Sequence, residues 1–154
     1  MNPHNHESPF GEVIFAYTRA QAVADGVQVE VTKTAQEAGI RIPVFLTRGV
    51  YDAYVTVPPN VTGQDDHNSR SEQPCLGNHL VAGEGSQPGR LWDIVWMLQF
   101  AIRRARGHSD RVPVALYVRN DERAAKLIKL IAQCGPLDMD DPSPAITVML
   151  PDED

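Results

Sequence analysis

The sequence predicts an α+β fold, with one long core helix packed on a mostly antiparallel sheet and several short N-terminal helices. Three observations lead to this fold class. Apolar side chains recur at three- and four-residue steps in residues 90–106, which is the period of a helix with a buried face. Apolar and polar residues alternate in 111–119 and 145–150, which is the period of a strand. Between residues 18 and 55, closely spaced Thr and Gly residues mark the ends of short helices.

Two of the short helices begin at a threonine that can accept a hydrogen bond from the first turn. Thr18 precedes the predicted helix 19–25, and Gly26 can end it in the left-handed conformation. Thr47 precedes the predicted helix 48–55, which ends before a pair of prolines.

A third short helix is predicted from Thr34 and Glu37, which have the spacing of a capping box, with Gly39 as its stop. Valines alternate with polar residues across 27–31, which indicates a half-buried strand. Residues 42–46 indicate a second strand, placed by its proline at an edge or at a strand start.

The helix 90–106 is the clearest element of the chain. Asp93 lies in its expected first turn, arginines lie in its last turn, and Gly107 follows, as the helix dipole favours. Trp92 and Trp96 widen the apolar stripe, so that little more than one edge is expected to face water.

Residues 111–119 and 145–150 read as strands of the sheet, but the segment between them is ambiguous. Within 124–134, the apolar residues fit a helical spacing and also fit the alternation of a strand. The residues alone leave both alternatives open.

The chain is expected to form one domain over residues 12–151, after a disordered leader at 1–11. Its 154 residues, with 42% hydrophobic and 22% charged side chains, are ordinary for a globular domain with a core. Residues 56–89 are rich in Pro, Gly and polar side chains, which predicts a long flexible insertion.

Composition excludes several classes of protein. The longest apolar run, 91–102, is interrupted by polar residues and is too short to span a membrane, and the N-terminus lacks the features of a signal peptide. The 2 cysteines are too few for a disulfide scaffold and predict free thiols in a cytoplasmic protein.

Charge is distributed unevenly along the chain. The net charge of −6 argues against general nucleic-acid binding, which requires a basic face. Residues 103–129 nevertheless carry 8 basic and 3 acidic residues, a local excess of +5. An anion-binding surface there is possible, although a basic helix end followed by an acidic tail also explains the pattern.

No catalytic motif, metal site or cofactor site is predicted. A nucleophile elbow, a P-loop and a zinc-protease motif are all missing from the sequence. Cys75 and His79 have a spacing that zinc can use, but no second pair accompanies them, so we interpret them as part of a polar loop.

The first candidate site lies at the start of the long helix. Gly89 exposes the first helical N–H groups, and Arg90 can bind phosphate or carboxylate, with Trp92 beside it. Asp93 is a candidate base, or a group that orients Arg90. The competing interpretation is structural: Asp93 pairs with first-turn N–H groups, Arg90 is a surface cation and Trp92 lies in the core.

The second candidate site is Tyr17 with Arg19, at the start of the first short helix. A cation at a helix N-terminus is unfavourable for the dipole, so Arg19 is expected to pair with an acid such as Asp93 or Glu30, or to bind an anion. A structural ion pair is the favoured interpretation.

A resemblance adds to this interpretation and spans most of residues 12–151. Its clearest stretches are Phe15-Ala16-Tyr17-Thr18-Arg19, Val29-Glu30-Val31-Thr32, Gly89-Arg90-Leu91-Trp92-Asp93 and Ile146-Thr147-Val148-Met149-Leu150-Pro151. In these stretches the sequence resembles an uncharacterised family of small proteins encoded on bacterial plasmids and phages. The resemblance implies a domain carried by mobile elements and no particular activity. It also implies a β-hairpin over 126–150, which favours a strand for 126–134.

Two hypotheses for function follow. The first is an accessory protein of a mobile genetic element that binds an unknown host-encoded or element-encoded macromolecule, in defence evasion or plasmid maintenance. The second is a small enzyme acting on an anionic substrate, bound by Arg90, Arg19 and Tyr17, with Asp93 or Glu30 as base. They differ in geometry, because catalysis requires these side chains to converge in one pocket.

Overall fold

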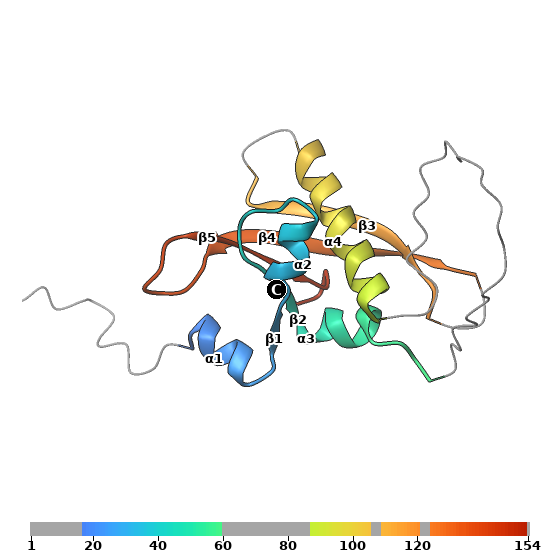
Figure 1. Ribbon diagram of the computed structural model, residues 1–154, viewed down its shortest axis with the longest axis horizontal. Helices are drawn as coiled ribbons and strands as arrows, with labels where there is room; N and C mark the ends of the chain where they lie inside the picture. Colours follow the sequence, from blue (N-terminus) through green and yellow to red (C-terminus); the bar gives the residue numbers. More distant parts are fainter. Residues whose placement is uncertain (1–16, 60–86, 106–108, 121–123, 154) are drawn as a thin grey trace, which may run out of the picture.

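The computed structural model describes residues 17–59, 87–105, 109–120 and 124–153 (Figure 1). The predicted leader 1–11, and residues 60–86 of the predicted insertion 56–89, lie outside the described residues. In chain order the elements are α1 (Arg19–Ala24), β1 (Gln28–Glu30), α2 (Thr32–Glu37), β2 (Val44–Thr47), α3 (Arg48–Val50), the π-helical turn η1 (Tyr51–Val55), α4 (Gln87–Arg104), β3 (Arg111–Val118), β4 (Lys126–Pro136) and β5 (Pro144–Met149).

The described strands form a five-stranded sheet in the order β1-β2-β5-β4-β3. Neighbouring strands are antiparallel, except that β2 and β5 are parallel. The predicted α+β class with a mostly antiparallel sheet is therefore confirmed. The ambiguous segment is a strand: β4 has a hydrogen-bonded neighbour on each side, so the sheet satisfies its main-chain groups at both edges.

The core lies between α4 and one face of the sheet. Side chains alternate across a strand, so every second residue of the sheet faces α4. The fully buried side chains of this core come from the sheet, from α4, and from α3 and η1: Val44, Leu46, Val50, Val55, Ile94, Val95, Leu98, Val114, Leu130 and Val148. The short helix α2 contacts α4 on the same side of the sheet.

The helix α1 lies against the opposite face of the sheet. Its first residue, Arg19, contacts Phe45 of β2 and Thr147 of β5. The residues that follow these two, Leu46 and Val148, belong to the core beneath α4. Because successive side chains of a strand point to opposite faces, α1 and α4 are separated by the sheet.

The predicted helix ends at Thr18, Gly26, Gly39 and Thr47 are confirmed. The Thr18 side chain and the Gln21 side chain form a reciprocal capping box at the start of α1. Gly26 and Gly39 end the first two helices with φ angles of 74° and 93°. Residues with a Cβ atom disfavour this left-handed conformation, whereas glycine adopts it readily. The predicted helix 48–55 is present as α3 followed by η1, and the Thr47 hydroxyl accepts a bond from the Val50 N–H at 3.3 Å.

Two helix starts were predicted wrongly. The second short helix begins at Thr32, and Val31, which has no side-chain cap, precedes it, so Thr34 and Glu37 form no capping box. The long helix begins at Gln87 and includes a proline and a glycine that sequence reasoning placed in the insertion. Proline is tolerated there because the first turn of a helix lacks intrahelical partners for its N–H groups.

The Trp92 and Trp96 side chains, expected in the buried stripe, are 37% and 40% exposed. Across the described ranges, no helix combines the length and the apolar character that crossing a membrane requires.

Candidate functional site

Arg90 is a buried structural residue. Its side chain is only 2% exposed, and it donates hydrogen bonds to the Arg119 carbonyl at 2.5 Å and to Asn120 Oδ1 at 2.7 Å. The Asn120 amide in turn donates to the Ala53 carbonyl at 2.7 Å. Burial lowers the pKa of Arg90. The guanidinium therefore links α4 to the end of β3 and, through Asn120, to η1. These bonds use the N–H donors that a ligand would need.

Asp93 and Trp92 follow Arg90 on α4. Because α4 starts at Gln87, Asp93 lies in the second turn, and the first turn contains no acidic residue. The predicted position of Asp93 in the first turn is thus wrong. Trp92 is partly exposed and stacks on Trp96, with ring centroids 6.0 Å apart.

Arg19 is also a structural residue, on the other face of the sheet. Its guanidinium donates to the Leu137 carbonyl at 2.6 Å, to Thr147 Oγ1 at 2.8 Å and to Gln28 Oε1 at 2.9 Å. The guanidinium also lies over the Phe45 ring, 4.6 Å from its centroid. Neither of its expected partners, Asp93 or Glu30, is among these contacts. Desolvation lowers the pKa of Arg19, and the nearby Asp138 acts in the opposite direction.

The remaining candidates stay close to α1. The Tyr17 hydroxyl donates to Asp25 Oδ2 at 3.0 Å, and desolvation together with this carboxylate raises the pKa of Tyr17. Glu30 is exposed on β1, opposite Phe45 in the register of the sheet. The predicted site residues therefore form two groups on opposite faces of the sheet, and they do not converge.

Sequence reasoning missed an aromatic stripe along the exposed side of α4. Trp92, Trp96, Phe100 and Arg104 follow one another at four-residue steps, which places them on one oblique line of the helix surface. Phe100 is 43% exposed, slightly more than the two tryptophans. The Arg104 guanidinium lies 5.4 Å from the Phe100 ring centroid. The four-residue spacing of these side chains was the available signal in the sequence. The two tryptophans were assigned to the core because the buried face of the helix has the same period.

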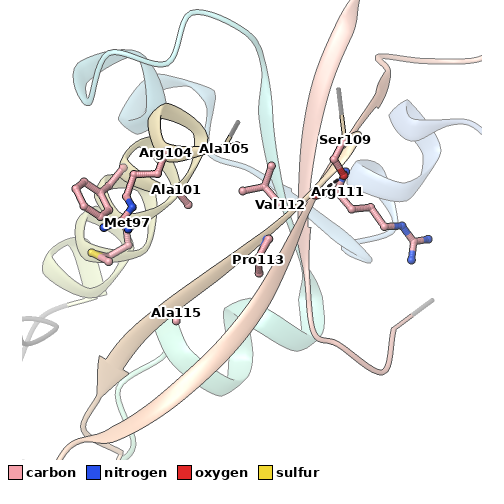
Figure 2. Close-up of a pocket in the computed structure, with 10 residues that line it drawn as sticks. Met97, Ala101, Arg104, Ala105, Ser109, Arg111, Val112, Pro113 and Ala115 are labelled. Carbon is pink, nitrogen blue, oxygen red and sulfur yellow. Dashed lines mark hydrogen bonds between the residues drawn. The ribbon is translucent and has the colours of Figure 1, made fainter. Parts of the chain in front are cut away.

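The C-terminal half of this stripe borders a groove between α4 and β3 (Figure 2). The groove has a volume of about 440 Å³. Met97, Phe100 and Ala101 form its helical wall, and Val112 and Pro113 lie on the strand side. Arg104 lies at the helical wall near Met97, whereas the Arg111 side chain extends away from α4.

The groove is positively charged within an acidic chain. Among the described residues that line it, the charged ones are Arg104 and Arg111, and of these Arg104 lies at the helical wall. Both arginines belong to the sequence region 103–129, which has the local excess of +5. A groove with an apolar wall beside cationic groups is suited to a ligand that carries both apolar and acidic groups.

Comparison with known proteins identifies the family and little else. Neither the curated proteins nor the solved structures contain a significant match to this chain. One family model matches residues 6–154, which is nearly the whole chain. The chain therefore belongs to DUF6573, a family of unknown function.

Proposed function

We propose that this protein binds a macromolecular partner through the exposed side of α4, as an accessory protein of a mobile genetic element. One observation carries the proposal: the aromatic stripe of Trp92, Trp96, Phe100 and Arg104 lies at the surface rather than in the core. Contiguous exposed apolar surface rimmed by polar groups marks binding sites, whereas single exposed apolar residues do not.

The stripe is large enough to contribute to specific binding. Trp, Phe and Arg are enriched at the energetically dominant positions of protein interfaces. Each of these three aromatic residues is about 40% exposed, so covering them removes roughly 200–300 Å² of apolar surface from water. That burial favours association by about 5–7 kcal/mol before the entropic cost of binding is subtracted.

The biological setting of the proposal rests on the resemblance to proteins of bacterial plasmids and phages. We infer a partner encoded by the host or by the element, met in the cytoplasm during defence evasion or plasmid maintenance. The acidic net charge of −6 supports a protein partner rather than a nucleic acid.

The enzymatic alternative requires Arg19, Arg90 and a carboxylate to meet around one substrate. The two arginines instead donate to main-chain carbonyls on opposite faces of the sheet. Among the described contacts of Arg19 and Arg90, none brings the two guanidinium groups together.

The test is quantitative affinity capture from lysate of a host that carries the element. Trp96→Glu places a carboxylate in the middle of the stripe and is expected to weaken capture of a specific partner at least about tenfold. Met139→Glu is the matched control, because Met139 is 62% exposed on the loop between β4 and β5, away from the stripe.

The proposal is supported by a partner that wild type and Met139→Glu retain and Trp96→Glu loses. Equal recovery by all three proteins, or no specific partner for any of them, contradicts it. Circular dichroism and thermal unfolding of the variants check that Trp96→Glu is folded.

A further inference from the structure

We infer that the partner contributes an extended, partly acidic segment that pairs with β3 as a sixth strand and fills the groove beside α4. This inference rests on the proposed function, because it specifies the partner of the same surface. It follows from three features: the direction in which the main-chain groups of β3 point, the shape of the groove and its charge.

The strand β3 is at an edge of the sheet. In the part of the chain that the structure describes, the strand order ends at β3, whose strand neighbour is β4. The pairing with β4 runs the length of β3, from Arg111 opposite Gln133 to Val118 opposite Lys126. An edge strand of eight residues presents a row of main-chain donors and acceptors to whatever lies beyond it.

The hydrogen bonds at the start of β3 show which residues point outward. The Cys134 N–H donates to the Asp110 carbonyl at 2.7 Å, which makes Arg111 and Gln133 a non-hydrogen-bonded pair. Consistently, the Arg111 N–H and carbonyl both bond the Ser109 hydroxyl, at 3.2 and 2.8 Å, rather than β4.

In an antiparallel ladder this orientation repeats at every second residue, so the main-chain groups of Pro113, Ala115 and Tyr117 also point away from β4. Proline fits this pattern, because its missing N–H would have faced outward. Pro113 thus limits indiscriminate pairing at the edge, whereas Ala115 offers both an N–H and a carbonyl in the outward direction.

The groove accommodates the side chains of a strand placed beside β3. Alternate residues of such a strand point toward α4, where Met97, Phe100 and Ala101 form an apolar wall. Figure 2 shows Val112 pointing toward the helix, between that wall and the strand. The geometry matches β-strand addition, in which main-chain bonds give affinity and pockets select alternate side chains.

The position of Arg104 indicates which part of the incoming segment should be acidic. Arg104 lies at the end of the groove nearest the start of β3, because α4 and β3 run in opposite directions along each other. A carboxylate that faces α4 at this end would meet the Arg104 guanidinium. We therefore expect apolar residues at alternate positions, with Asp or Glu opposite the beginning of β3.

A second copy of this chain is a poorer occupant. An antiparallel pairing of two β3 strands centred on Ala115 places Arg111 of one copy opposite Arg119 of the other. Both copies also bring their basic region, 103–129, with its excess of +5. This repulsion favours an acidic partner over self-association.

The test selects binders to the full-length protein from a displayed library of short random peptides, with selected peptides then titrated by fluorescence anisotropy. The expected sequences alternate apolar residues and contain Asp or Glu near one end. Replacing alternate amide hydrogens of a selected peptide with methyl groups leaves the side chains intact and is expected to weaken binding roughly three- to tenfold.

Two variants of the edge have opposite expected effects. Ala115→Pro removes an outward donor at a position equivalent to Pro113, and is expected to weaken peptide binding roughly three- to tenfold. Pro113→Ala supplies a donor and is expected to strengthen peptide binding by a similar factor.

Arg104→Glu tests the charge of the groove. It is expected to shift the preference from acidic to basic peptides, about two- to fivefold and less at high salt.

Several results would overturn the inference: failure to enrich peptides, insensitivity to N-methylation, or equal binding by Ala115→Pro, Pro113→Ala and wild type. A dimer in sedimentation that Ala115→Pro dissociates would assign the edge to self-association instead. If a captured partner depends on Trp96 but not on Ala115 or Pro113, the proposed function stands and the sixth-strand inference fails.

Discussion

The two faces of the sheet use their side chains differently. On the α1 face, polar groups are engaged within the protein: Arg19 reaches main-chain carbonyls of the loop after β4, and the Asp138 carboxylate accepts N–H bonds from α1. On the α4 face, a tightly packed core is covered by a helix whose outer side presents two tryptophans and a phenylalanine to water.

This difference indicates where binding takes place. The charged residues that looked most like ligands, Arg19 and Arg90, satisfy carbonyl groups of the same chain, so removing them is expected to damage folding. The aromatic residues that looked like core are partly exposed, so we expect them to contribute less to folding than their size suggests. Mutations on α4 that separate stability from binding test this contrast directly.

The largest contrast in stability is expected between two residues of α4 that are two positions apart. Leu98 is fully buried, and Leu98→Ala should lower the free energy of unfolding by about 2–5 kcal/mol. Trp96→Ala removes a larger side chain, but one that is 40% exposed, and should cost less, about 1–2 kcal/mol. Urea unfolding monitored by circular dichroism measures both. Equal losses would mean that the aromatic stripe belongs to the core.

A smaller but still large effect is expected for Arg90→Ala. The substitution leaves the Arg119 carbonyl and the Asn120 side chain without their buried donor, and should cost about 2–4 kcal/mol. Arg48→Ala is the matched control, because the Arg48–Asp52 ion pair is exposed and should contribute less than about 0.5 kcal/mol. If both variants unfold at the same urea concentration, Arg90 is not the anchor of α4.

The sequence was sufficient to predict the elements that local periodicity determines. The long helix and the strands at 111–119 and 145–150 were found because their apolar residues repeat with the helical or strand period. The strand at 126–134 needed the family resemblance, because its residues fit both periods.

The environment of individual side chains was not predictable in the same way. Whether Arg90 faces water depends on β3 and η1 arriving beside α4 from distant parts of the sequence. Likewise, Trp92 and Trp96 are exposed because the sheet and α2 cover only one side of the helix. Such contacts leave no local pattern, and an exposed aromatic stripe has the same spacing as a buried one.

On the α1 face, Arg19→Ala is expected to lower the free energy of unfolding by about 1–2 kcal/mol. The guanidinium joins α1 to β1, β5 and the loop after β4, and these bonds are lost together. Arg19→Lys retains the charge but not the planar fork, so it should recover less than half of the loss. Recovery close to wild type would show that charge, rather than geometry, holds α1 in place.

The smallest expected effect is a change in the pH dependence of stability at Asp138. Its carboxylate accepts bonds from the N–H groups of Met139 at 2.8 Å and of Arg19 and Ala20, both at 3.2 Å. The Met139 bond, and then those from α1, lower the pKa of Asp138, with desolvation acting in the opposite direction.

Because the folded pKa of Asp138 lies below the unfolded value, the folded protein binds fewer protons in acid than the unfolded chain does. The stabilisation is therefore complete above the ordinary carboxylate pKa, near pH 4, and is lost as the pH falls through the folded value. Asp138→Asn should flatten the decline in melting temperature below about pH 4, whereas Asp140→Asn removes the same charge from the same loop and should leave that decline steep. If the two variants flatten it equally, the acid sensitivity reflects net charge alone, and the link between the loop and α1 is not what protonation breaks.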